Sequence, residues 1–186
     1  YKLLFAALSF SFVMIGTIVH LVPILKDLGA APMQAAGTAA LVGIFSIIGR
    51  LGTGALLDRY RANIVGSCAY LLPIPGYVVL LADGGNPLSQ MFAVAMFGLT
   101  LGAEVDVITY LITRHFGLKR FASVTSVMFS FIALGAALGP LAAGTSFDRF
   151  GGYAPYMLLT ITMAAIASLA VLSMRRPPFA AAGHPH

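Results

Sequence analysis

Six long apolar segments dominate the pattern of hydrophobic and polar positions along the chain. Each is close to the roughly 20 residues that a helix needs to cross the hydrocarbon core of a bilayer. The short stretches between them carry charged or turn-forming residues, such as "KDLGAAPM", "DRYRAN", "DGGNP" and "TRHFGLKR". The pattern therefore predicts six membrane-spanning helices, over residues 3–25, 34–57, 64–81, 88–111, 121–145 and 153–174.

Helices rather than strands are expected in all six segments. Strands of a membrane barrel would alternate polar and apolar residues, and these runs do not alternate. A helix satisfies its own backbone hydrogen bonds, which the lipid interior requires. We therefore predict an all-α membrane protein whose neighbouring helices are joined by short connections.

The composition supports a membrane protein and argues against a soluble domain and a nucleic-acid-binding protein. Charged residues make up 9% of the chain and hydrophobic residues 59%, whereas a soluble domain is about 25% charged. The net charge of +5 does not indicate nucleic-acid binding, because the basic residues are scattered singly between apolar runs. Cys68 is the single cysteine, so no internal disulfide or metal site is expected, and no cofactor is predicted.

The basic residues also predict the orientation. If the first helix starts in the cytoplasm, nine basic residues lie inside and two outside, which accounts for all 11 and fits the positive-inside rule. We expect a bacterial inner (plasma) membrane protein with both termini cytoplasmic: a bundle over residues 1–176 and a disordered cytoplasmic tail over 177–186. The inside set is Lys2, Arg50, Arg59, Arg61, Arg114, Lys119, Arg120, Arg175 and Arg176, and the outside set is Lys26 and Arg149.

The sequence contains an internal repeat. "GRLGTGALLDRY" begins at Gly49 and "GPLAAGTSFDRF" at Gly139. Both follow G-x4-G-x3-D-R-aromatic, with a constant offset of 139 − 49 = 90 residues. Each ends the second helix of a three-helix set, and because three is odd, the second set enters the membrane inverted. Gly135 and Gly139 also form a G-x3-G pair, which predicts a close helix contact.

Two stretches resemble the major facilitator superfamily. "GRLGTGALLDRYRANI" is similar to the G-x3-D-R-x-G-R motif that follows the second and eighth helices of that family, although Ala62 departs from the usual Gly-Arg ending. "YLITRHFGLKRFA" resembles a junction in bacterial monocarboxylate and oxalate/formate-type porters. The resemblance implies the C-terminal six-helix half of a twelve-helix transporter. The N-terminal half is then expected as a missing partner, in agreement with a chain that opens on Tyr1 rather than Met.

The same resemblance implies a cytoplasmic latch at the end of the second helix. In that fold, Asp58 would accept hydrogen bonds from a neighbouring helix end and Arg59 would pair with an acidic group. The alternative is that these are solvated loop charges that follow the positive-inside rule. The latch residues are Gly54, Asp58, Arg59 and Arg61.

Glu104 and Asp106 are the candidates for proton coupling, because ionisable groups within a bilayer usually face a cavity or a partner. They are about 200° apart on a helix, so they cannot both face one cavity squarely. One would line the pathway while the other pins the helix, and the sequence leaves open which is which. Asp106 shares its face with Tyr110, a candidate substrate contact. A permanent hydrogen-bonded network is the structural alternative.

Arg50 and His20 complete the candidate substrate site. The arginine fork suits a carboxylate, and by resemblance Arg50 falls where monocarboxylate-type porters have a substrate-binding arginine. Arg50 could instead extend to the membrane surface or pair with Asp58, two turns away. His20 lies close to the outer end of its helix, where a histidine usually has no special role.

We therefore expect half of a secondary transporter for a small organic anion such as a monocarboxylate. Transport would be coupled to protons or run by exchange, through alternating access. A membrane enzyme is not expected, since the sequence has no H-E-x-x-H, G-x-S-x-G or cysteine–histidine pair. A non-transporting scaffold or receptor subunit, or a carrier of a neutral or drug-like substrate, stays open.

Overall fold

The computed structural model describes residues 2–116 and 121–174. Within these ranges, the side chains at 104, 105, 108, 109, 111–116 and 121–123 lie outside the description. The described residues fold into seven α-helices and contain no strand. The helices are α1 (Lys2–Asp27), α2 (Pro32–Arg59), α3 (Ala62–Leu71), α4 (Pro73–Asp83), α5 (Pro87–Phe116), α6 (Phe121–Phe150) and α7 (Ala154–Leu172).

These helices confirm the predicted all-α membrane architecture of six spans. Five segments are long and apolar enough to cross a membrane, and Pro87–Ala103 in α5 is a further apolar helix. The third segment, Ala62–Asp83, consists of α3 and α4 together. Pro73 has no backbone N–H and cannot donate to the carbonyl of Ala69, so this span is divided where α4 begins.

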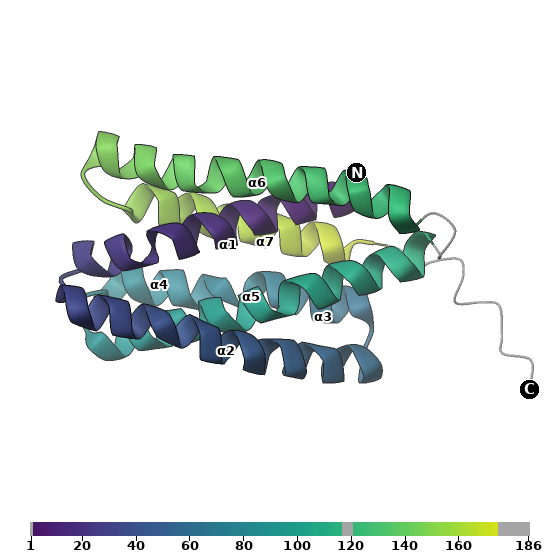
Figure 1. Ribbon diagram of the computed structural model, residues 1–186, viewed down its shortest axis with the longest axis horizontal. Helices are drawn as coiled ribbons and strands as arrows, with labels where there is room; N and C mark the ends of the chain where they lie inside the picture. The colour runs from purple at the N-terminus through teal and green to yellow at the C-terminus, as the bar shows by residue number, and fades with distance from the viewer. Residues whose placement is uncertain (1, 117–120, 175–186) are drawn as a thin grey trace, which may run out of the picture.

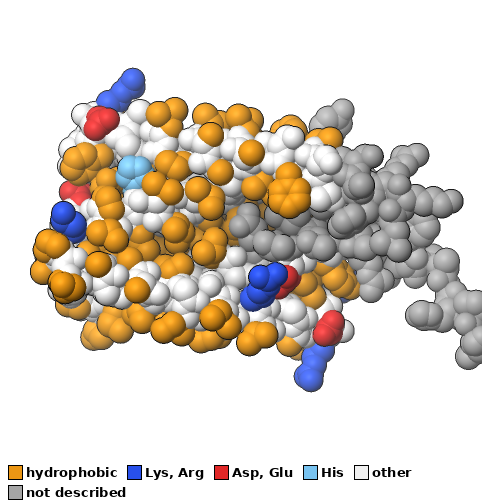
Figure 2. All heavy atoms as spheres, in the orientation of Figure 1, with side chains coloured by type: hydrophobic (Ala, Val, Ile, Leu, Met, Phe, Trp, Pro, Cys, Tyr) orange, Lys and Arg blue, Asp and Glu red, His pale blue; other side chains and the backbone are white. Residues whose placement is uncertain are grey.

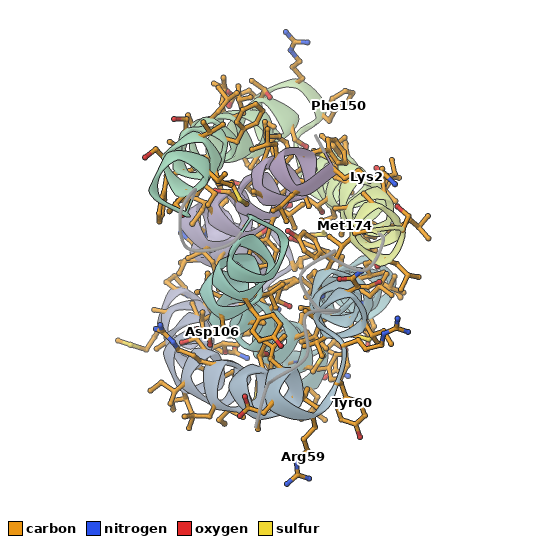
Figure 3. The ribbon with its side chains drawn as sticks, turned by 90° about the vertical axis from the view of Figure 1, so that its right-hand side faces the viewer. Lys2, Arg59, Tyr60, Asp106, Phe150 and Met174 are labelled. Atoms are coloured by element: carbon orange, nitrogen blue, oxygen red, sulfur yellow. The ribbon has the colours of Figure 1, made fainter. Side chains whose placement is uncertain are left out.

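The spans are arranged in two layers (Figure 1). The front layer contains α6, α1, α5 and α2 in this order, and α7, α3 and α4 cover its back, as the end view in Figure 3 also shows. Lys2 Nζ donates to Ser173 Oγ at 2.9 Å, and Asn63 donates to the carbonyl of Met174. The first and last described residues therefore lie at one end of the bundle, which we call the terminal end.

Two close helix contacts hold the front layer together, α2 against α5 and α6 against α1. A methyl group on Gly49 would lie 2.7 Å from Leu99 Cα, and one on Gly139 would lie 3.0 Å from the carbonyl carbon of Phe12. Gly135 approaches Phe12 as closely, which confirms the contact predicted for the G-x3-G pair. Each contact joins the second helix of one predicted three-helix set to the first helix of the other, and we call these contacts the α2–α5 seam and the α1–α6 seam.

Buried hydroxyl groups join α1 to the back layer. Tyr77 and Tyr156 are 0% and 1% exposed. The hydroxyl of Tyr77 shares a short hydrogen bond with that of Thr17, and the hydroxyl of Tyr156 donates to the carbonyl of Val13 at 3.2 Å. Buried polar groups are stable only when they have such partners, so these bonds fix α1 against α4 and α7.

Large apolar side chains cover the outside of the bundle (Figure 2). Ile47 and Leu51 on α2 are 64% and 72% exposed, and Phe129 and Leu141 on α6 are 63% and 62% exposed. Contiguous apolar surface on this scale is not tolerated in water. The chain is therefore an integral membrane protein.

Candidate functional site

An ion pair connects the two helices of the α2–α5 seam. Arg50 Nε lies 3.7 Å from Asp106 Oδ1, and this is the ion pair that the described residues contain. The Arg50 side chain is 64% exposed and that of Asp106 is 26% exposed. Figure 3 shows Asp106 on the side of the bundle away from α3, α4 and α7, where α5 lies against α2. The pair is thus part of the front layer.

The pair lies well inside the apolar length of the bundle. Arg50 is nine residues before the end of α2, and Asp106 is ten residues before the end of α5. At about 1.5 Å per residue, both lie roughly 14 Å from the terminal end of their helices. In Figure 2, the other charged groups of this face gather towards the two ends of the bundle. A charged pair at this depth is costly for the fold and is usually retained for function.

The contact leaves the arginine available for further partners. A separation of 3.7 Å is too long for a hydrogen bond. The five N–H donors of the guanidinium are therefore not used by Asp106. Since the Arg50 side chain is mostly exposed, a carboxylate could still reach these donors.

The structure does not support one alternative that the sequence left open for Arg50, because Arg50 pairs with Asp106 and not with Asp58. Asp106 is therefore the carboxylate that meets the arginine. The Glu104 side chain lies outside the described residues, so its predicted role stays a prediction. Tyr110 is partly exposed one turn beyond Asp106, on the same face of α5.

His20 lies near the far end of α1, away from the Arg50 pair along the helix axes. Its Nδ1 atom is 3.1 Å from the hydroxyl of Tyr153, and the ring of Tyr153 also packs on Phe147. Burial, followed by the charges of Asp27 and Asp148, raises the pKa of Tyr153 above its ordinary value, so its hydroxyl stays protonated. The sequence did not single out Tyr153, because nothing local indicates that the α6–α7 connection returns to α1.

The predicted latch residues lie at the terminal end. Gly54, Asp58 and Arg59 belong to the last turns of α2, and Arg61 precedes α3. Asp58 and Arg59 are exposed, and Figure 3 shows Arg59 pointing away from the bundle. Within the described residues neither forms an ion pair, so the partners that the resemblance implies stay a prediction.

No group of three histidine, cysteine or carboxylate side chains suited to a metal comes together in the described part of the chain. The chemistry of the site is therefore that of a charged pair on an apolar face.

Comparison with known families decides the class of this membrane protein. The sequence profile of the Major Facilitator Superfamily matches residues 3–185. The chain belongs to this superfamily. Proteins of the Major Facilitator Superfamily are carriers and not enzymes. This confirms the resemblance that the motif ending α2 indicated.

Two curated members of the superfamily are similar to the chain. Monocarboxylate transporter 12 of Xenopus laevis is 28% identical over 169 residues, which cover 86% of the chain and 36% of that protein. Monocarboxylate transporter 12 of Homo sapiens is 29% identical over 145 residues, which cover 76% of the chain and 28% of that protein. The chain thus spans about a third of the length of the curated relatives it matches.

Proposed function

We propose that the chain is the C-terminal half of a secondary transporter for a small organic anion such as a monocarboxylate. The observation that carries this proposal is the Arg50–Asp106 ion pair on the front layer, with the arginine side chain 64% exposed. A guanidinium that faced lipid would be expensive. The front layer therefore faces a water-filled pathway, and Arg50 binds the carboxylate of the substrate there.

The charges of the pair suggest how a proton is coupled to the anion. Arg50 and Asp106 together have no net charge, so an added monocarboxylate brings an uncompensated negative charge into an apolar region. Asp106 can remove that charge by taking up a proton, and Arg50 is then free to hold the substrate. Proton and anion thus move together as an electrically neutral load. The similarity to monocarboxylate transporter 12 in two species supports a carboxylate as the substrate.

The remaining predicted residues have supporting roles in this proposal. Tyr110 contacts the substrate one turn from Asp106, His20 contacts it near the far end, and Glu104 is a second proton site. Gly54, Asp58, Arg59 and Arg61 form the latch at the terminal end. We further infer that both termini lie in the cytoplasm of a bacterial inner membrane and that a second six-helix bundle packs on the front layer. The two bundles would rock about the site.

The test is a transport screen on the full-length gene product in proteoliposomes. Lactate, pyruvate, formate and oxalate are offered with and without an inward proton gradient. We expect uptake of a monocarboxylate that the gradient drives. Asp106→Asn should uncouple uptake from the gradient, and Arg50→Ala should lower it by about a hundredfold, as the loss of a charged partner does.

Two controls make the test decisive. Lys26→Ala removes an exposed charge at the far end and should transport normally. A panel of neutral solutes covers the alternative of a carrier for uncharged or drug-like substrates. Normal carboxylate uptake by both Arg50→Ala and Asp106→Asn, or uptake of neutral solutes alone, would overturn the proposed site.

A further inference from the structure

We infer that Gly102 is a positioning residue for the anion site, because the missing side chain lets α5 approach α2 closely enough for Asp106 to reach Arg50. This inference rests on the proposed function and adds to it the residue that sets the geometry of the pair. A methyl group on Gly102 would overlap the carbonyl oxygen of Ser46 and lie 2.7 Å from the backbone nitrogen of Arg50. Both are backbone atoms, which cannot rotate away as a side chain does.

Gly102 lies one turn before Asp106 on α5, so the two residues share a face of that helix. On α2, the backbone next to Gly102 is that of Ser46 and of Arg50 itself. The spacing of the helices at this point is therefore also the spacing between the two residues of the ion pair. The pair is already 3.7 Å apart, so any widening separates a short aspartate side chain from its partner.

Other glycines extend the seam without touching the pair. A methyl group on Gly98 would lie 2.6 Å from Phe45 Cβ, one turn further from Asp106. Substitution at Gly98 should therefore widen the same seam more mildly, since no contact there would be as short as that between Gly102 and the carbonyl oxygen of Ser46.

The α1–α6 seam provides a matched control. A methyl group on Gly139 would also crowd backbone, that of Phe12. No ion pair crosses this seam among the described residues. Gly139→Ala should therefore cost similar packing without changing the distance between Arg50 and Asp106. Gly37→Ala is the open control, because nothing lies within 4 Å of the added methyl group.

The experiment measures uptake by the full-length gene product in proteoliposomes, with the carboxylate that gives the highest uptake among lactate, pyruvate, formate and oxalate. Gly102→Ala should raise KM about ten- to a hundredfold, as a misplacement of about 1 Å can do. Gly139→Ala and Gly37→Ala should keep KM within about twofold, whatever their effect on the amount of folded protein. Uptake is normalised to that amount.

The decisive measurement adds Asp106→Glu, whose carboxylate reaches one bond further. In the Gly102→Ala background this change should recover most of the lost affinity. In the Gly139→Ala background it should have the same effect as in the unmodified protein. A purely structural glycine would not produce this dependence on side-chain length.

If Gly102→Ala does not fold, the same comparison is made with Gly98→Ala, where we expect a smaller rise in KM and the same recovery. Equal KM changes in the two seams, or no recovery by Asp106→Glu, would overturn the inference. Normal transport by Arg50→Ala and Asp106→Asn would instead show that the proposed function is wrong, so the two failures are distinguishable.

Discussion

The two seams of the front layer have the same packing and different chemistry. Gly49 meets Leu99 in one seam as Gly139 meets Phe12 in the other. By the ninety-residue offset, Pro140 stands where Arg50 does. Asp106 lies seven residues after Leu99, and Val19 lies seven residues after Phe12, so Val19 occupies the position that corresponds to Asp106. The repeat therefore preserves the helix contact, while the charges occur in one copy only.

The seams also differ in how they are fixed to the rest of the bundle. The α1–α6 seam is reinforced from the back by Tyr156, whose hydroxyl donates to the α1 backbone. Among the described residues, no side-chain hydrogen bond crosses from α2 to α5, and the ion pair is the polar contact there. In the described part of the α2–α5 seam, the glycines bring the two backbones close together, and the charged pair adds to that contact.

The largest effect should come from reversing the charges of one seam. Arg50→Asp places two carboxylates together, and we expect carboxylate uptake to fall more than about a hundredfold. Adding Asp106→Arg restores an opposite pair and should recover part of the activity. Pro140→Ala, at the repeat-related position, should leave uptake within about twofold. Equal losses at Arg50 and Pro140 would show that the seams do not differ in function.

Gly16→Ala should destabilise the α1–α6 seam and leave the chemistry of the other seam unchanged. The added methyl group would collide with the Tyr156 hydroxyl and lie 2.7 Å from the carbonyl carbon of Gly139. Overpacking of this kind costs about 1–3 kcal/mol. Circular dichroism during unfolding by sodium dodecyl sulfate in detergent micelles measures the loss, with Gly37→Ala as the control in open space. An unchanged unfolding midpoint would contradict the close contact.

Tyr156→Phe should cause a smaller loss. It removes the hydroxyl that donates to Val13 and keeps the aromatic ring in the core, so the expected cost is about 1 kcal/mol. KM for the transported carboxylate should not change, because the α2–α5 seam is not touched. Tyr60→Phe, on a side chain that is 60% exposed, is the control. A change in KM would show that the two seams are coupled.

The smallest effect should appear at Tyr153 and only at high pH. Its folded pKa is above the ordinary value of 10.0, chiefly through burial and then through Asp27 and Asp148. The stability that its protonated hydroxyl contributes is therefore present below pH 10 and is lost as the pH rises above that value. We expect Tyr153→Phe to lose less stability than the unmodified protein when unfolding midpoints at pH 8 and above pH 10 are compared. The same change in unfolding midpoint with pH in both proteins would contradict this prediction.

The fold was predictable because its determinants are local. Uninterrupted apolar runs and breaker residues define the spans, and the two Gly-Asp-Arg stretches reveal the repeat. The division of the third span at Pro73 also has a local cause, the missing N–H. The two-layer arrangement is not local, since it depends on which helix faces approach each other.

The candidate residues of the site could be selected from the sequence, whereas their geometry could not. Arg50 and Asp106 were both identifiable, because charges in apolar runs are rare. Their pairing was not, because it depends on the rotation of α2 and α5 about their axes, and Asp58 was the much nearer candidate along the sequence. Tyr153 could not be found at all, since only the return of the α6–α7 connection brings it to His20.

The attachment of α2 to the bundle has one more consequence. α2 packs mainly on α5, so we expect the two helices to move together. In the proposed transport cycle, Arg50 and Asp106 would then keep a constant separation while the pathway opens first on one side of the membrane and then on the other. The concentrations of the proton and the carboxylate on the open side would then decide which of the two leaves first. A change in the distance between Arg50 and Asp106 would play no part.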